Sequence, residues 1–170
     1  TLRKTKHLNK NKALTFFRRN EKETKEHNMI VDMERNDLSK ICKTGSVKID
    51  KQKKVEEYRD LFHYVTTIKG VIKNKMSNHD IISSLMPGGS VIGCPKISTI
   101  QLLNRKEKFD RNIYTGSFGI IHSNGDMRFN IMIRTLLNFK NDIELSVASG
   151  VILGSTAKKE YNENYIKAKS

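Results

Sequence analysis

The sequence has few of the residues that cross-link, kink or anchor a chain. Its 170 residues include two cysteines, two prolines and no tryptophan. Cys42 and Cys94 lack the paired spacing of a metal or redox site, so both are expected to be reduced thiols. No apolar run approaches the length that spans a bilayer, and no signal-peptide pattern opens the chain. These absences predict a cytoplasmic protein without disulfide bonds or a membrane segment.

Acidic residues are also scarce: 32 Lys and Arg face 18 Asp and Glu, a formal charge of +14. A basic nucleic-acid-binding module is therefore one alternative. However, the excess is shared evenly by residues 1–60 and 61–170, most of it is lysine, and no aromatic-interleaved basic motif is present. A solvated basic surface is the simpler interpretation, without nucleic acid as a partner.

The hydrophobic pattern predicts an α+β fold, with antiparallel sheets flanked by helices, in one domain. The expected helices are a charged one at 10–25 that continues to 41, a short one at Asp80–Met86 capped by Asn78, one at 96–108 and one at Ala157–Lys169. The expected strands are Ser46–Ile49, Leu61–Ile72, Asn112–His122, Arg128–Phe139 and Ile143–Leu153. Turn residues at 123–126 and 140–142 predict that the last three strands form one antiparallel meander.

A loop rich in glycine and proline, Leu85–Lys96, precedes the amphipathic run Ile97–Leu103. Such a loop can present bare backbone N–H groups at a helix N-terminus, where an anion is stabilised. Many loops of this composition bind nothing. The loop is therefore a candidate anion site only in combination with other residues.

Two glutamate pairs stand at helical i, i+3 spacing, Glu23 with Glu26 and Glu160 with Glu163. On their own they are compatible with solvated helix faces, and Glu163 with Lys167 with an ordinary i, i+4 pair. If the two helices faced each other, four carboxylates would converge, and such a cluster needs a hard cation such as Mg²⁺.

Two further polar residues stand in predicted strands. His63 alone is compatible with a core or edge histidine. Arg134 lies within the apolar strand segment Phe129–Thr135, where an inward guanidinium is costly unless it meets an anion.

Six motifs of the sequence resemble motifs of the chorismate-utilising enzymes and occur in the same order. This family includes anthranilate synthase component I, aminodeoxychorismate synthase component I and isochorismate synthase. Asn20–Leu38 resembles the family block NEKExAEHxMIVDxxRNDL, and the glycine loop resembles FPGGSVSGAPK. The other matching segments are Leu61–Thr67, Tyr114–Gly116, Ile131–Thr135 and Ala148–Glu163.

The resemblance implies that residues 1–170 are the C-terminal portion of the chorismate-binding domain, with Thr1 on the threonine of a P-I-x-G-T motif and the N-terminal portion absent. Three positions depart from the family pattern: Cys94 stands for alanine, Ser149 for another small residue and Gly154 for an aspartate. The loss of the carboxylate at Gly154 makes the start of the last helix less certain.

The resemblance also implies roles for individual residues around Mg²⁺-bound chorismate. Glu26 and Glu163 would bind the metal directly, and Glu23 and Glu160 through water. The implied catalytic residues beside the substrate ring are His63 and Ser90. The implied substrate-binding residues, with Tyr114 and Arg134 on the enolpyruvyl carboxylate, are Thr1, Tyr114, Arg134, Ala148, Ser149, Gly150 and Lys167.

Within the family, the segment Phe129–Thr135 resembles FNIAIRTL of the aminodeoxychorismate synthases, and Thr1–Arg3 lacks the TRxRG continuation of anthranilate synthases. This favours amination of chorismate to 4-amino-4-deoxychorismate, with ammonia from a glutaminase subunit. In that subfamily a lysine two residues before the position of Thr1 forms a covalent adduct with the ring. Anthranilate synthase component I and isochorismate synthase are the alternatives, and the isolated 170 residues are expected to be inactive.

Overall fold

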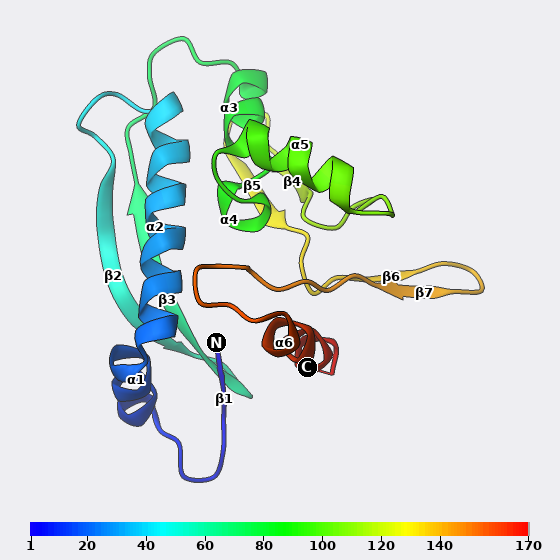
Figure 1. Ribbon diagram of the computed structural model, residues 1–170. Coiled ribbons are helices and arrows are strands. Elements are labelled where there is room, and N and C mark those ends of the chain that lie inside the picture. The colour runs from blue at the N-terminus through cyan, green and yellow to red at the C-terminus, as the bar shows by residue number, and fades with distance from the viewer. Residues whose placement is uncertain (170) are drawn as a thin grey trace. The chain divides into compact units, whose positions relative to one another are not determined.

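The computed structural model describes residues 1–169, which form two compact units, Thr1–Leu85 and a second unit that begins at Met86 (Figure 1). Each unit combines helices with small antiparallel sheets. The predicted α+β class with antiparallel sheets is therefore confirmed. Among the described residues, no helix has both the length and the apolar character needed to cross a bilayer.

The first unit is built on a three-stranded antiparallel sheet with the order β1-β3-β2. The strands are β1 (Leu2–Arg3), β2 (Lys48–Glu57) and β3 (Leu61–Lys69). Helices α1 (Lys10–Arg19) and α2 (Glu21–Ile41) pack on this sheet, and Figure 1 shows α2 running along it. The core that they close consists of Ala13, Phe17, Val55, Phe62 and Tyr64.

The helix predicted from residue 10 to 41 is in fact two helices, separated at Asn20. Asn20 adopts an extended backbone, and its side-chain oxygen accepts a hydrogen bond from the Glu23 N–H at 3.2 Å. Asparagine is a strong N-cap because it satisfies an amide that the first helical turn leaves unpaired. The cap places Glu23 and Glu26 in the first two turns of α2.

Strand β2 is much longer than the predicted Ser46–Ile49. Its charged, mostly exposed residues lack an apolar alternation, so pairing with β3, rather than burial, defines the strand. The pairing is irregular between Lys51 and Lys54, where Lys53 adopts a left-handed backbone with φ of 50°. Such a bulge bends the strand and redirects a side chain.

Helix α3 (Asn78–Leu85) ends the first unit, and Ser77 rather than the predicted Asn78 caps it. The Ser77 hydroxyl accepts a hydrogen bond from the Asp80 N–H at 3.1 Å, and the Asp80 carboxylate accepts one from the Ser77 N–H at 3.1 Å. This reciprocal pair is a capping box, with aspartate in place of the usual glutamate.

The described part of the second unit, residues 86–169, contains three helices and two β-hairpins. The helices are α4 (Gly89–Ile92), α5 (Lys96–Lys106) and α6 (Ala157–Ala168). Strand β4 (Ser117–Ile121) pairs with β5 (Met127–Ile131), and β6 (Leu136–Asn138) pairs with β7 (Ile143–Leu145). Helix α5 lies within the predicted range, and α6 begins at the predicted residue.

The predicted three-stranded meander is wrong, because the expected strand Arg128–Phe139 is interrupted. Arg134, between β5 and β6, has a φ of 50°, a left-handed conformation that ends an extended strand. Two separate two-stranded sheets result. Strand β4 also starts later than predicted, at Ser117 instead of Asn112. The reason is that Asn112 and Thr115 have φ values of 48° and 65° and form turns.

Candidate active site

In the second unit, the backbone of Ala148 joins two predicted substrate-binding side chains. It hydrogen-bonds to the hydroxyl of Tyr114, and its carbonyl accepts a hydrogen bond from Lys167 Nζ at 3.2 Å. Lys167 Nζ also lies 2.8 Å from Glu163 Oε1. The loop after β7, the turn before β4 and helix α6 therefore meet at Ala148.

The phenol of Tyr114 is half-buried in this cluster. Burial raises the pKa of Tyr114, and this effect exceeds the opposing effects of the Arg111 charge and the Ala148 hydrogen bond. Tyr114 is therefore a neutral hydrogen-bonding group at ordinary pH, able to donate to an anion.

Glu160 is the most buried of the four predicted metal ligands, with an exposed fraction of 7%. Ser155 Oγ donates a hydrogen bond to Glu160 Oε1 at 2.8 Å and accepts one from the Ile152 N–H at 3.1 Å. Ser149 Oγ donates to the Glu160 carbonyl at 3.3 Å. These contacts join the loop of residues 146–156 to the first turn of α6.

Two residues that hold this site together were missed by sequence reasoning. Ser155 lies just before a helix, and a hydroxyl at such a position is the signal that could have identified it. Arg111 forms two hydrogen bonds to Glu107, at 2.8 and 2.6 Å, and one to Thr115 Oγ1 at 3.2 Å. Its guanidinium also lies 6.0 Å from the ring of Tyr114, so it fixes the turn that carries this residue.

The other predicted site residues of the second unit differ in how far they are buried. Arg134 is exposed on the left-handed turn between β5 and β6, so its predicted position within a strand is wrong. Gly150 is exposed, and Ser90 is half-buried in α4.

The glycine loop forms the short helix α4. The amides of Val91 and Ile92 donate to the carbonyl of Gly88, at 3.2 and 3.3 Å, and the Gly93 amide donates to Gly89 at 2.7 Å. Three of the backbone N–H groups that were predicted to be available to an anion therefore donate hydrogen bonds within the loop itself.

In the first unit, Glu23 and Glu26 are both half-buried near the start of α2. Their spacing places both carboxylates on one face of the helix. Glu26 Oε1 lies 3.6 Å from Lys22 Nζ. The adjacent His27 turns toward the sheet, where its Nε2 lies 2.7 Å from Thr66 Oγ1 and its ring lies 4.7 Å from that of Tyr64.

His63 lies on β3 between the buried residues Phe62 and Tyr64, so it faces away from the helices. Because Leu2 is opposite Phe62, continuing the antiparallel register by one residue sets Thr1 opposite His63. This register sets the predicted substrate-binding residue Thr1 beside the predicted catalytic residue His63.

The donor set fits magnesium in its chemistry. Each unit supplies one pair of carboxylates, and Mg²⁺ prefers carboxylate oxygens together with retained water. Within either unit, residues 1–169 contain no group of three His, Cys, Asp or Glu side chains able to hold a metal.

Comparison with known proteins assigns the chain to a family. A family model described as chorismate binding enzyme matches residues 1–170. The chain belongs to this family of chorismate-binding enzymes. It is 38% identical over 149 residues to the aminodeoxychorismate synthase component 1 of Bacillus subtilis (strain 168), covering 88% of this chain and 32% of the relative. It is 37% identical over 150 residues to an anthranilate synthase component 1 of Haloarcula marismortui, covering 88% of this chain and 31% of the relative.

A solved relative supports the same assignment. The crystal structure of anthranilate synthase component I from Streptococcus pneumoniae TIGR4 superimposes with a TM-score of 0.78 at 35% identity, over 93% of this chain and 36% of that one. The chain thus spans about a third of the length of these relatives. The sequence identities to aminodeoxychorismate synthase and to anthranilate synthase are similar, so they do not distinguish between these two activities.

Proposed function

We propose that this chain is part of component I of an aminodeoxychorismate synthase. The whole enzyme would aminate chorismate to 4-amino-4-deoxychorismate in the cytoplasm, with Mg²⁺ and with ammonia from a glutaminase subunit. Both compact units would belong to one chorismate-binding domain, of which residues 1–170 are the C-terminal portion. The observation that carries the proposal is the cluster in which Tyr114, Ala148 and Lys167 meet beside Glu160 and Glu163.

The two glutamate pairs would hold the metal, Glu26 and Glu163 directly and Glu23 and Glu160 through water. Bound Mg²⁺ would supply Lewis acidity that eases loss of the ring hydroxyl. The burial of Glu160 and its bond from Ser155 support this role, because the carboxylate is already desolvated and oriented.

The substrate would be held by side chains whose donors suit carboxylates. Arg134 would present its forked guanidinium and Tyr114 its hydroxyl to the enolpyruvyl carboxylate. Backbone groups of Ala148, Ser149 and Gly150, with Lys167 and Thr1, would complete the binding site. The neutral phenol of Tyr114 supports this assignment, since only the protonated form can donate.

His63 and Ser90 would lie beside the ring, where His63 would transfer a proton or orient the leaving group. The register that sets Thr1 opposite His63 supports a shared position for these two residues. We assign proton transfer to His63 because a histidine pKa lies near physiological pH.

Product analysis of the full-length protein tests this proposal. Supplied with chorismate, ammonia and Mg²⁺, it is expected to form 4-amino-4-deoxychorismate without release of pyruvate. Chromatography and a coupled pyruvate assay measure both outcomes. Formation of anthranilate with pyruvate, or of isochorismate without use of ammonia, would show that the reaction within the family is a different one.

A further inference from the structure

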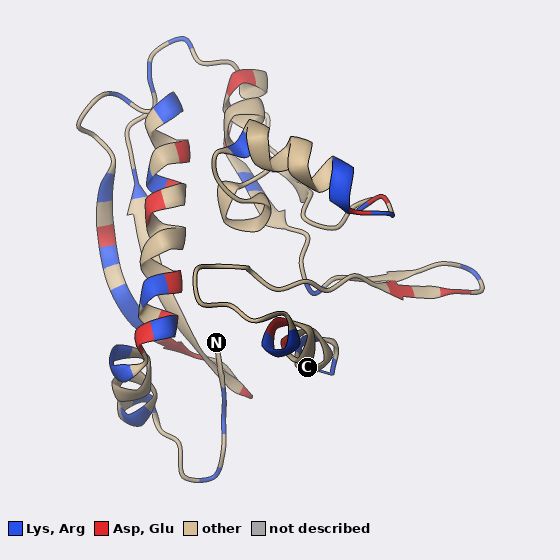
Figure 2. Ribbon diagram, viewed as in Figure 1, with Lys and Arg blue, Asp and Glu red and all other residues tan. Residues whose placement is uncertain are grey.

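A hollow of about 390 Å³ lies in the first unit. Its lining comes from α1, α2, β2 and β3 and consists of Arg18, Thr24, Gln52, Lys53 and Tyr64. Figure 2 shows that α1 and β2 both carry several basic residues. The lining includes two cations and no carboxylate.

The position of Lys53 is fixed by the backbone around it. Its φ of 50° is unusual for a residue with a side chain, and such conformations persist only where the surroundings impose them. The Lys53 N–H donates to Thr66 Oγ1 at 3.0 Å, and the same oxygen lies 2.7 Å from His27 Nε2. The bulge of β2 is thereby held so that Lys53 lines the hollow.

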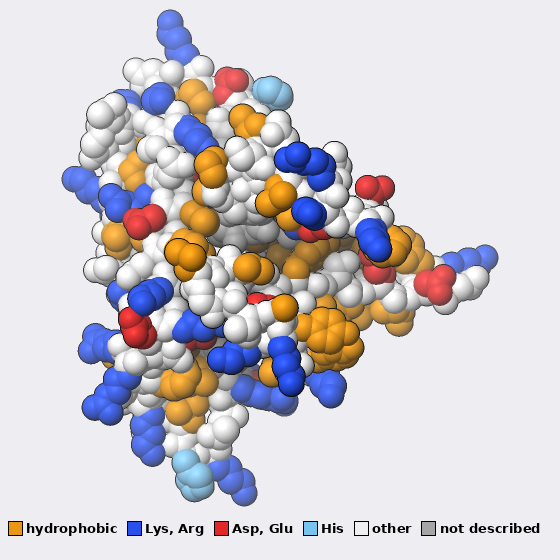
Figure 3. All heavy atoms as spheres, in the orientation of Figure 1, with side chains coloured by type: hydrophobic (Ala, Val, Ile, Leu, Met, Phe, Trp, Pro, Cys, Tyr) orange, Lys and Arg blue, Asp and Glu red, His pale blue; other side chains and the backbone are white. Residues whose placement is uncertain are grey.

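Neither cation is neutralised locally. Within residues 1–169, Arg18 and Lys53 have no ion-pair partner, and the hydroxyl of the largely buried Tyr64 makes no hydrogen bond. Elsewhere the visible surface intersperses Lys and Arg with Asp and Glu (Figure 3). Two cations facing one hollow without a counter-charge repel each other, and an anion would relieve this repulsion.

The charges act on the groups around the hollow. Burial raises the pKa of Tyr64, and the charge of Arg18 opposes this effect. The Tyr64 phenol therefore stays protonated at ordinary pH and can donate a hydrogen bond.

We propose that this hollow binds the phosphate group of a small phosphorylated molecule. The Arg18 guanidinium and the Lys53 ammonium provide the two positive charges, and the Tyr64 hydroxyl provides a neutral donor. A phosphate monoester carries nearly two negative charges at neutral pH, which two cations match better than they match a single carboxylate. The site does not depend on the chorismate chemistry.

Titration of the full-length protein with inorganic phosphate and with ribose 5-phosphate tests the site. Calorimetry is expected to give one binding event, tighter for ribose 5-phosphate because the hollow has room beyond a phosphate group. Arg18→Gln and Lys53→Gln should each weaken binding about tenfold.

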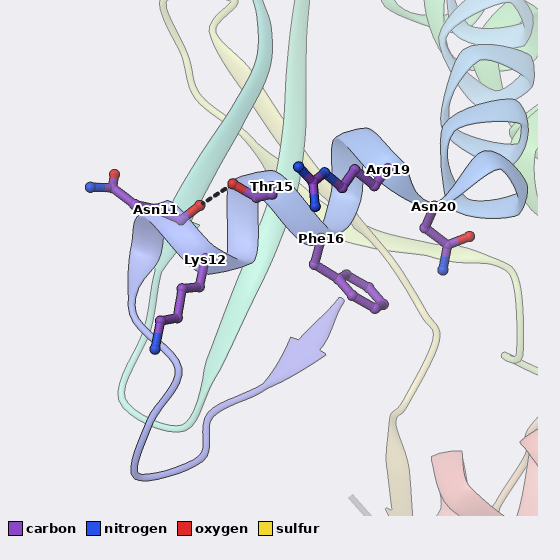
Figure 4. Close-up of a pocket in the computed structure, with 6 residues that line it drawn as sticks. All are labelled: Asn11, Lys12, Thr15, Phe16, Arg19 and Asn20. Carbon is purple, nitrogen blue, oxygen red and sulfur yellow. Dashed lines mark hydrogen bonds between the residues drawn. The ribbon is translucent and has the colours of Figure 1, made fainter.

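Arg19→Gln and Lys51→Gln are the matched controls, because each removes a cation from the same element. Arg19 lines a different hollow of about 620 Å³ along α1 (Figure 4), and Lys51 is exposed on β2. Both controls should bind as the unmodified protein does. Equal losses in all four variants would show attraction to general basic charge and overturn the proposal, as would equal affinity for the two ligands.

Discussion

Glu26→Gln and Glu163→Gln, each made alone in the full-length enzyme, are expected to reduce Mg²⁺-dependent turnover at least about a hundredfold. Glutamine keeps the shape of the side chain but removes the charge that offsets a divalent cation. Metal-assisted stabilisation of a reaction contributes several kcal/mol, so its loss has a large effect on rate. Steady-state kinetics across a Mg²⁺ titration measure this effect.

Glu21→Gln is the matched control for Glu26→Gln. Glu21 lies in the same helix but is exposed and paired with Lys25 at 2.7 Å. An exposed pair of this kind contributes little to stability, so turnover should be unchanged. Full activity in both the Glu26 and the Glu163 variant would show that these residues are not metal ligands.

Arg134→Ala is expected to raise the KM for chorismate about 10- to 100-fold, with a smaller effect on kcat. A hydrogen bond between charged groups contributes about 1.5–3 kcal/mol, and the proposed contact is made to a carboxylate that does not react. Arg134 is exposed, so its removal should leave the stability of the protein nearly unchanged.

Arg128→Ala provides the comparison for Arg134→Ala. Arg128 is an exposed arginine of β5, opposite Ile120 of β4. Its loss should not change KM. A KM that is unaffected by Arg134→Ala, with thermal unfolding also unaltered, would contradict the assignment of Arg134 to the substrate carboxylate.

The fold could be predicted where apolar periodicity is strong, and failed where single residues redirect the backbone. Helix α6 begins where the sequence indicates, and β3 was recognised from its β-branched and aromatic residues. The sequence did not reveal the break at Asn20, because a capping asparagine inside a charged run resembles a helix-surface residue. The left-handed turn at Arg134 could not be predicted from the sequence for a similar reason, since neither glycine nor proline marks it.

The residues of the candidate site could be selected by motif, but their contacts could not. The i, i+3 spacing indicated that Glu160 and Glu163 share a helix face. It did not indicate that Glu160 is buried and bound by Ser155, or that Lys167 reaches the carbonyl of Ala148. Those contacts depend on how the loop of residues 146–156 folds back onto α6, which is a tertiary property.

Counting bound metal ions is the most direct test of the proposal that Glu26 and Glu163 hold the same metal ion. Mn²⁺, which prefers similar oxygen ligands to Mg²⁺, can be titrated into the full-length protein with chorismate and followed by electron paramagnetic resonance. We predict one ion per chain, with affinity reduced at least about tenfold by either Glu26→Gln or Glu163→Gln alone. Unchanged binding in either variant, or two ions of which each variant loses a different one, would contradict a shared site.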